Sequence, residues 1–239
     1  MSASSIPIYL QIADELRQNI ESSVYPVGSQ LPTEAELSDR FGVNRHTLRR
    51  AIDQLRQEGL VRVDRGRGMF VAAAPVTLSI GKRVRYNEAL RARGLKPQFK
   101  SLRIAELPAD ASVAKRLEVE LGSAVVVFER LSIADDIPIS IASSYFSPPF
   151  LKGIADHCQT YRSISKLLHQ EYGFDHIRRS TRISARVVQP RDARELGVSL
   201  NTPILLTESV NVNQHGQVVE YGVTRFRSDR MELVFENHD

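Results

Sequence analysis

The N-terminal part of the chain has the hydrophobic spacing of three short amphipathic helices. The first is expected to start at Pro7, and every fourth residue after it is apolar, at Ile8, Ile12, Leu16 and Ile20. Thr33 and Glu36 have the spacing of a capping box, which predicts the start of a second helix that ends before Gly42. Asn44 is a suitable N-cap for the third helix, whose apolar face is Leu48, Ala51, Ile52 and Leu55.

After the third helix the hydrophobic spacing changes to that of two short strands. Gly59 is expected to end the helix, and residues 60–64 and 69–72 are predicted to pair as a hairpin. The turn between them, at 65–68, holds two arginines and two glycines. The small residues and the proline of 72–75 then mark the best boundary between two domains.

Beyond residue 75 the chain alternates between predicted strands and helices. Strands are expected over 99–107, 124–132, 137–147, 177–189, 203–213 and 218–227, and helices over 111–117, 163–172 and 190–196. Two pairs of strands are separated only by short polar turns, which indicates antiparallel hairpins. The expected fold class is α+β: a helical domain with a hairpin, joined to a domain with an antiparallel sheet.

The composition is that of a soluble globular protein with one large or two small domains. The chain has 239 residues, of which 42% are hydrophobic and 25% are charged. The single cysteine, Cys158, excludes a disulfide framework and a thiolate zinc site. No apolar run approaches the roughly 18 residues of a membrane span, and the start lacks the basic residues of a signal peptide. We therefore expect a cytoplasmic protein without a membrane partner.

The net charge of +4 is less informative than the position of the charges along the chain. Residues 1–44 contain two arginines and six acidic residues, whereas residues 45–67 contain seven arginines and three acidic residues. Residues 76–239 contain 23 basic and 19 acidic residues. A short basic block behind an acidic one is typical of a surface that binds a phosphate backbone.

The basic block coincides with the third helix and the hairpin after it. Two helices joined at Gly42, the second of them basic, have the pattern of a helix-turn-helix, in which the second helix enters the major groove. The residues predicted to contact DNA are Arg45, His46, Thr47, Arg49 and Arg50 on the helix, and Gly66 and Arg67 on the hairpin turn. Arginine can bind guanine through two hydrogen bonds, and the glycines let the turn approach a phosphate or the minor groove.

A solvated basic helix face is the alternative interpretation of the same arginines. Arg49 and Asp53, for example, have the spacing of an i,i+4 ion pair. This alternative leaves unexplained why the helix-turn-helix spacing, the charge polarity and the basic hairpin coincide. A dinucleotide-binding loop at 66–68 is excluded, because it needs a third glycine and a following helix, whereas 69–71 has the pattern of a strand.

A second group of basic residues lies on the predicted strand at 177–189. Alternation along a strand places five polar residues on one face, at Arg178, Ser180, Arg182, Ser184 and Arg186. The opposite face is mostly apolar and is expected to face the core. Arginine and serine donors on one face match the oxygens of a phosphate or phosphonate. An edge face kept soluble by its charge is the alternative.

Several short runs, in order and correctly spaced over residues 7–71, carry a family resemblance. They are Pro7-Ile8-Tyr9, Leu31-Pro32-Thr33-Glu34, Phe41-Gly42-Val43-Asn44-Arg45, Thr47-Leu48-Arg49-Arg50-Ala51, Glu58-Gly59, Arg67-Gly68 and Phe70-Val71. The region resembles the winged helix-turn-helix of the GntR family of bacterial transcription regulators. The resemblance implies DNA contacts at Arg45, His46, Thr47, Arg49, Gly66 and Arg67. Many members have a DNA-contacting arginine early in the second helix, where this chain has Ala35.

The C-terminal part resembles the UTRA effector domain of the HutC branch, whose fold is similar to that of chorismate lyase. Residues 44–55 and 181–186 resemble PhnF-type regulators of phosphonate utilisation. The implied effector site comprises Arg85, Tyr86, Arg130, Ser144, Tyr145, Arg178, Glu220 and Tyr221. Its arginines would converge on an anion, and Glu220 would accept a hydrogen bond from a hydroxyl or ammonium group of the ligand. The implied domains are a DNA-binding domain at 1–71, a linker at 72–77 and an effector-binding and dimerisation domain at 78–239.

Together these features predict a ligand-responsive regulator, in the simplest form a homodimeric repressor of genes for phosphonate uptake or metabolism. Its expected partners are double-stranded operator DNA, a second copy of the chain and a small anionic effector such as a phosphonate or phosphate compound. A sugar phosphate or carboxylate effector is an alternative, and so is an enzyme with a lyase-like domain. The six histidines lack metal-ligand spacing, and the sequence contains no nucleophile-elbow motif. We therefore expect no catalytic residue, metal or cofactor.

Overall fold

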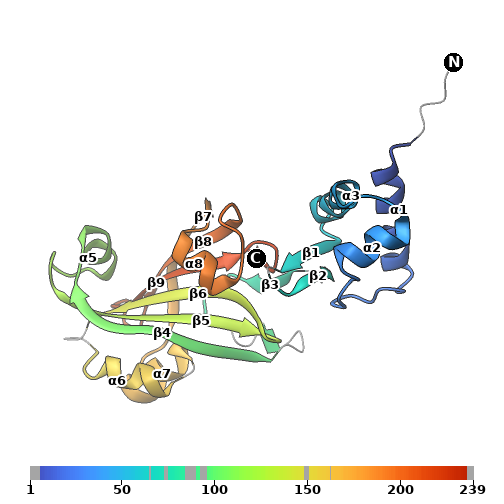
Figure 1. The fold of residues 1–239 in the computed structure, drawn as a ribbon. Helices are drawn as coiled ribbons and strands as arrows, with labels where there is room; N and C mark the ends of the chain where they lie inside the picture. The colour runs from blue at the N-terminus through green and yellow to red at the C-terminus, as the bar shows by residue number, and fades with distance from the viewer. Residues whose placement is uncertain are drawn as a thin grey trace. The chain divides into compact units, whose positions relative to one another are not determined.

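The computed structural model describes residues 6–64, 66–72, 75–83, 90–91, 96–147, 151–161 and 163–235. The chain divides into two compact units, Met1–Ala74 and Pro75–Asp239, which Figure 1 draws as ribbons. Within the described residues, no helix is both long enough and apolar enough to cross a membrane.

The N-terminal unit contains three helices and a hairpin, as the sequence predicts. Its elements are α1 (Ile8–Glu21), α2 (Glu34–Phe41), α3 (Arg45–Gln57), β1 (Val61–Asp64) and β2 (Gly68–Val71). The capping box is confirmed, because Thr33 accepts from the backbone of Glu36 and the Glu36 side chain returns to the backbone of Thr33. Gly42 ends α2 with a φ of 63°, a left-handed conformation that glycine adopts without strain. Local chemistry therefore accounts for the position of the turn.

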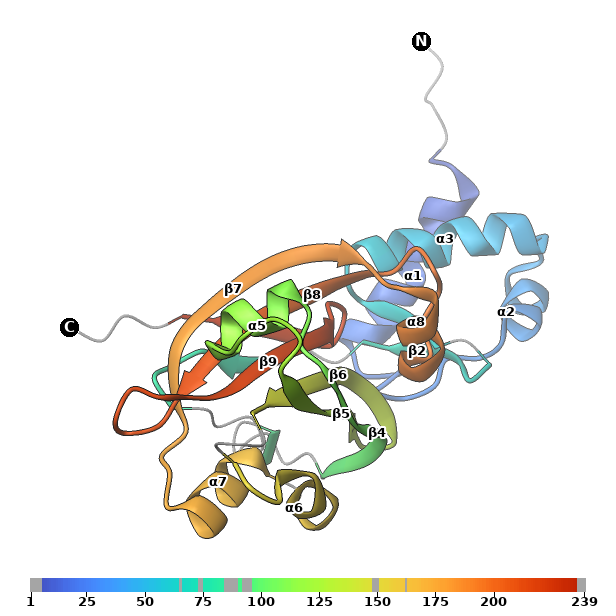
Figure 2. The same cartoon turned by 90° about the vertical axis from the view of Figure 1, so that its left-hand side faces the viewer.

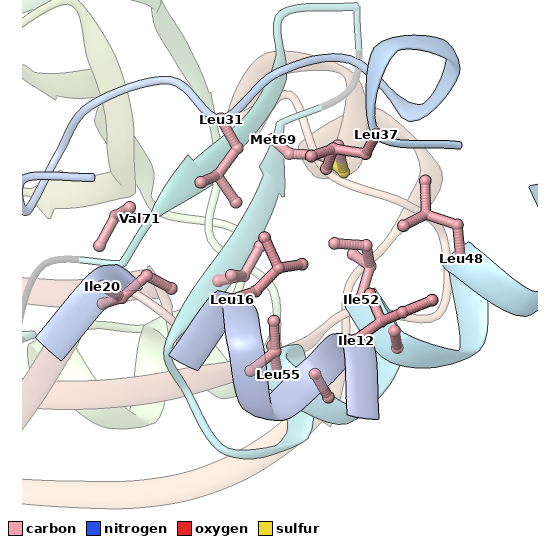
Figure 3. Close-up of a cluster of buried hydrophobic side chains, with 13 residues drawn as sticks. Ile12, Leu16, Ile20, Leu31, Leu37, Leu48, Ile52, Leu55, Met69 and Val71 are labelled. Atoms are coloured by element: carbon pink, nitrogen blue, oxygen red, sulfur yellow. The ribbon is translucent and has the colours of Figure 1, made fainter. Parts of the chain in front are cut away.

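The core of this unit lies where the three helices meet the hairpin (Figure 3). Leu16 of α1, Leu37 of α2 and Leu55 of α3 are fully buried there. The predicted apolar face of α3 is confirmed, because all four of its residues are buried. Ile8 is an exception on the face predicted for α1, since it is 59% exposed at the first turn. The first residue of α1 that enters the core is therefore Ile12, one helical turn after the first apolar residue of the predicted face.

The C-terminal unit is built on a six-stranded antiparallel sheet with the order β4-β5-β6-β9-β8-β7. Its strands are β4 (Pro97–Pro108), β5 (Ala124–Ala134), β6 (Ile137–Phe146), β7 (Ile177–Val187), β8 (Pro203–Val212) and β9 (Val218–Arg227). Both predicted hairpins, β5–β6 and β8–β9, are present. The α+β class expected from these hairpins is confirmed.

Helices cover both faces of the sheet (Figure 1). α6 (Ile154–Thr160) and α7 (Ile164–Tyr172) pack on one face, in a cluster with Phe128 and Phe146. α5 (Ala111–Leu117) and α8 (Pro190–Leu196) pack on the other. The sequence reasoning missed α6 and the parallel pair of β3 (Val76–Ser79) with β10 (Met231–Val234). β3 and β10 lie at opposite ends of the domain sequence, so local periodicity could not pair them.

The strand β7 lies at one edge of the sheet (Figure 2), and the polar face predicted for it is wrong. Its register shifts between Arg178 and Ser180, where a β-bulge inserts a residue. Arg178 pairs with Asn211, whereas Ser180 pairs with Val210 of the opposite face. The five predicted polar residues therefore do not share a face: Arg178 lies apart from Ser180, Arg182, Ser184 and Arg186.

The apolar face predicted for β7 is also not in the core. Ile183 is 39% exposed and Val187 is 60% exposed. Because β7 is an edge strand, it has a neighbouring strand on one side only. Alternation along the chain therefore identified a strand but overestimated how much of it is covered.

Candidate functional site

The first turn of α3 presents the side chains expected to reach into a DNA groove. Arg45 and His46 are exposed at its N-terminus. Asn44 caps the helix by accepting from the backbone N–H of Thr47 at 2.9 Å, and its Oδ1 also lies 3.2 Å from the Thr47 hydroxyl. The cap holds the start of the helix in place while leaving both exposed side chains outside the core.

Arg49 lies one turn further along α3 and is held by α2. Its Nε donates to Oε2 of Glu34 at 2.9 Å, and Nη2 lies 2.9 Å from the same oxygen. The Arg49 side chain is still 63% exposed, so the rest of its guanidinium faces solvent. The i,i+4 pair considered from the sequence is not formed, because Asp53 instead accepts from Arg56. Glu34 thus orients the side chain expected to read a base.

Arg50 turns back toward α1 rather than outward. Its guanidinium lies 4.1 Å from the centre of the Tyr9 ring, at the distance of a cation–π contact. Arg50 is exposed, so the contact leaves its charge near the surface. This geometry gives Arg50 a role in joining α1 to α3, in addition to the predicted DNA contact.

The hairpin turn between β1 and β2 is tied to the segment before α2. Gly66 has a φ of 75°, and the Arg67 N–H donates to the carbonyl of Asp64. Gln30 donates from its side chain to the carbonyl of Arg67 at 3.0 Å. Gly68 has a φ of 109°, a conformation that strains any residue with a side chain, and a Cβ there would also displace the end of the Gln30 side chain, 2.7 Å away. Sequence reasoning missed Gln30, which gave no local signal. Arg65 lies outside the described residues.

The C-terminal unit contains a cavity of about 390 Å³ between the sheet and α7, and most of the residues that line it are polar. Hydroxyl groups form much of its floor, contributed by Ser132, Ser140, Ser144, Ser209 and Thr224. Its cationic side chains, among the described residues, are Arg91, Arg130 and Lys166. The guanidinium of Arg130 lies 5.2 Å from the Phe128 ring centre and 5.7 Å from that of Phe99, so aromatic rings hold the charge in place.

The structure brings together only part of the effector site implied by the resemblance. Arg130, Ser144 and Glu220 line the cavity. Tyr145 comes directly after Ser144 on β6, and Tyr221 comes directly after Glu220 on β9. Consecutive residues of a strand face opposite sides, so both tyrosines point to the other face of the sheet. Their rings stack there at 5.7 Å, away from the cavity. Arg85 and Tyr86 lie outside the described residues.

Arg178 lies on the same side of the sheet as the cavity but does not line it. Its pairing with Asn211 places it on the cavity side of the sheet, but it is not among the described residues that line the cavity. Its Nη1 donates to the carbonyl of Gly81 at 2.6 Å. Burial lowers the pKa of Arg178, and the charge of Glu220 partly offsets this effect. Arg178 therefore lies on the cavity side of the sheet, near enough to Glu220 for the two charges to interact.

Glu220 is a buried carboxylate with three donors. It is 5% exposed, and it contacts Nε2 of His176 at 2.7 Å and Nδ2 of Asn211 at 2.7 Å. Its other oxygen accepts from the Ser144 hydroxyl. Burial alone raises the pKa of Glu220, but the charge of His176 and the three hydrogen bonds outweigh burial and lower the pKa to about 2.

We expect this shift to make the stability of the C-terminal unit depend on pH. The ordinary pKa of 4.5 falls to about 2 in the folded state, so the contribution of Glu220 is complete above pH 4.5 and is lost as the pH falls toward 2. Thermal unfolding between pH 6 and pH 2.5 checks this. Glu220→Gln should remove part of the acid-induced decrease in Tm, and an unchanged decrease would contradict the assignment.

The N-terminus of α7 forms the opposite side of the cavity. Ser163 is the N-cap, and Ser165 and Lys166 follow in the first turn. The Ser165 hydroxyl lies 2.8 Å from Nδ1 of His176, so His176 links this turn to Glu220. A helix N-terminus attracts anions through its backbone N–H groups and its dipole. The sequence predicts this helix but not that its N-terminus faces a cavity. Ser163, a suitable N-cap, is the local signal that marks this end of the helix.

Neither a metal-ligand cluster nor a reactive cysteine is found among the described residues. No group of three or more His, Cys, Asp or Glu side chains among them is arranged to hold a metal ion. Cys158 lies on the buried face of α6, and its burial raises the pKa of the thiol to about 12. The chemistry that the described site offers is therefore binding of a small anion by cations, hydroxyls and a helix N-terminus.

Comparison with known proteins identifies the class to which this fold and site belong. Residues 8–71 match the bacterial regulatory proteins of the gntR family, and residues 92–232 match the UTRA domain. The chain belongs to the GntR family and is a transcriptional regulator of the HutC type, with a DNA-binding helix-turn-helix and a UTRA effector domain. The described residues confirm the predicted winged arrangement, because the β1–β2 hairpin follows the helix-turn-helix directly.

Individual relatives extend along nearly the whole chain. An uncharacterized HTH-type transcriptional regulator of Rhizobium meliloti (strain 1021) is 32% identical, over 97% of this chain and 95% of its own length. The "Probable transcriptional regulator PhnF" of Escherichia coli (strain K12) is 30% identical over 96% and 95%. The crystal structure of PhnF from Mycobacterium smegmatis superposes with a TM-score of 0.67 at 26% identity, covering 95% of this chain and 99% of that one.

Proposed function

We propose that this regulator is a homodimeric repressor whose operator affinity is lowered by a small anionic effector bound in the cavity of the UTRA domain. The observation that carries the proposal is the convergence of Arg130 on β5 and Lys166 on α7 at one cavity, next to a helix N-terminus. Such an arrangement supplies charge-assisted hydrogen bonds to several oxygens of one anion. Phosphate and phosphonate groups have that shape and charge.

The resemblance to PhnF-type regulators supports a phosphonate or phosphate compound as effector and genes of phosphonate uptake or metabolism as targets. A sugar phosphate or a carboxylate remains the alternative effector, because the anion site by itself distinguishes only weakly among oxyanions. The effector would favour a state that binds the operator less tightly. A 100-fold loss of affinity requires a coupling free energy of about 3 kcal/mol, within the usual range for allosteric proteins.

The dimer is proposed from family resemblance and from the symmetry of operators. A dimer of helix-turn-helix domains binds two half-sites about one helical turn apart. Sedimentation of the full chain with a DNA duplex selected from random sequences tests this directly. Two chains per palindromic duplex are expected, and a single chain per duplex would contradict the proposal. Titration of phosphonates, phosphate, sugar phosphates and carboxylates into that complex, followed by fluorescence anisotropy, tests the effector.

Arg130→Gln should remove most of the stabilisation that the effector gives. A ligand present at about 100 times its Kd stabilises the folded state by roughly 2.7 kcal/mol, and this gain depends on the anion contacts. The measurement is the shift in Tm produced by inorganic phosphate or methylphosphonate. Arg103→Gln is the matched control, because Arg103 is exposed on the neighbouring strand β4 and pairs in register with Glu129 on the face away from the cavity. An equal shift in both variants would exclude Arg130 from the anion site.

A further inference from the structure

We propose that the part of the effector lying against the sheet is uncharged and carries hydroxyl groups, and that the cavity discriminates against an ammonium group there. The proposal rests on the proposed function, because it specifies the remainder of the anionic effector. It selects between the two possibilities that the sequence left open for Glu220, a ligand hydroxyl and a ligand ammonium.

The floor of the cavity is a grid of hydroxyl groups on adjacent strands. Ser144 of β6, Gly222 of β9 and Ser209 of β8 lie in one row across the sheet, since each is directly opposite the next. The next row contains Ala142 and Thr224. The small residues Ala142 and Gly222 leave room above the floor. Ser144 donates to Glu220, and the Ser209 hydroxyl lies 2.8 Å from that of Thr181, but each hydroxyl oxygen keeps a capacity to accept. This surface suits ligand hydroxyls, which can donate to these oxygens.

Glu220 is not available as the partner of a ligand cation. Three of its roughly four acceptor positions are used by His176, Ser144 and Asn211. Its negative charge is further balanced by Arg178, which lies close enough for the two charges to interact. The carboxylate therefore anchors groups of the protein and does not offer an unpaired charge to the ligand.

Asn211 supplies the acceptor that a ligand hydroxyl needs. Because the ionised Glu220 only accepts, the contact between them fixes the amide with Nδ2 toward Glu220. Oδ1 of Asn211 is then buried without a donor among the described residues, although Asn211 lines the cavity. A buried acceptor without a donor is costly, and a ligand O–H removes that cost.

The charge of the cavity favours a hydroxyl over an ammonium. Its described wall carries the cations Arg91, Arg130 and Lys166 but one carboxylate, Glu220. A doubly charged phosphate or phosphonate group complements this excess, whereas an ammonium elsewhere on the ligand would be repelled by it. The amide oxygen of Asn211 can accept a hydrogen bond from either a hydroxyl or an ammonium group. The positive electrostatic potential of the cavity therefore decides between the two.

Two ligands of the same length test this discrimination. 2-Hydroxyethylphosphonate and 2-aminoethylphosphonate differ only in carrying a hydroxyl or an ammonium group at the far end. Isothermal titration of the full chain at pH 7.5 should give at least a tenfold lower Kd for the hydroxyl compound. Equal binding, or tighter binding of the amine, would overturn this proposal but leave the anionic effector intact. Binding of neither would overturn the proposed anionic effector and this proposal with it.

A pair of matched variants tests the role of the floor. Thr207 and Thr224 lie directly opposite each other on β8 and β9, but of the two only Thr224 lines the cavity. Thr224→Val should lower the preference for 2-hydroxyethylphosphonate over methylphosphonate about fivefold or more, because valine keeps the shape and removes the hydroxyl. Thr207→Val should leave that preference unchanged. The same result in both variants would contradict a hydroxyl-binding floor.

Discussion

Arg49→Ala is expected to weaken specific operator binding by about 1–3 kcal/mol, or roughly 5- to 150-fold, while non-specific binding changes much less. Arg49 lies on the face of α3 away from the core, and Glu34 holds one edge of its guanidinium. The side chain is therefore oriented before DNA arrives, which reduces the entropy lost on binding. An oriented guanidinium can bind guanine through two hydrogen bonds, and alanine can form neither.

Fluorescence anisotropy with the selected operator and with a scrambled duplex measures both affinities at one salt concentration. Arg56→Ala is the matched control, because Arg56 lies in the last turn of the same helix and pairs with Asp53. It removes the same charge without touching the N-terminal half of α3. An operator affinity that is equal in the two variants would contradict the assignment of Arg49 as a base-reading residue.

His176→Leu should destabilise the C-terminal unit by about 3 kcal/mol, because removing a hydrogen-bond partner from a buried charged group costs more than the roughly 1–3 kcal/mol of a neutral one. His176 and Glu220 are both buried, and the imidazole contacts the carboxylate and Ser165 at once. Leucine would leave the buried carboxylate of Glu220 without one of its three hydrogen-bond partners. It would also release the first turn of α7 from the sheet, so effector binding should be lost together with stability.

Calorimetric unfolding of the full chain measures the effect on the transition of this unit. His169→Leu is the control, because His169 is exposed on α7 and the substitution should change stability by less than about 0.5 kcal/mol. The double variant His176→Leu with Glu220→Leu should recover part of the loss, since it removes the buried carboxylate that His176 would no longer contact. The recovery is incomplete because Arg178 then lacks the charge of Glu220. A double variant less stable than the single one would show that the pair itself is not the cause.

Predictions that rest on local chemistry agree with the structure in detail. The capping box at Thr33, the left-handed Gly42 and the cap at Asn44 depend on residues at most four positions apart. The hairpin between β5 and β6 is similar, because Asp135 and Asp136 both adopt a positive φ in the turn. Such features can be predicted because the atoms that form them are neighbours in every conformation of the chain.

Predictions that assumed a regular strand were less accurate. One inserted residue after Arg178 reverses the face of everything beyond it, and a period of two cannot detect such a bulge. The edge position of β7 likewise depends on which strands pair, and not on its own residues. Tyr145 and Tyr221 were grouped with their sequence neighbours, although consecutive residues of a strand face opposite sides.

The sequence by itself determined the helix-turn-helix, the basic face of its second helix and the antiparallel class of the larger domain. It also determined the family, because the diagnostic runs are short and local. The cavity proposed to bind the effector was decided by the tertiary structure alone. Arg130, Lys166 and Glu220 come from three segments separated by tens of residues, and only the strand order and the packing of α7 bring them to one place. Which ligand they select depends on hydrogen bonds across those segments, which no local pattern records.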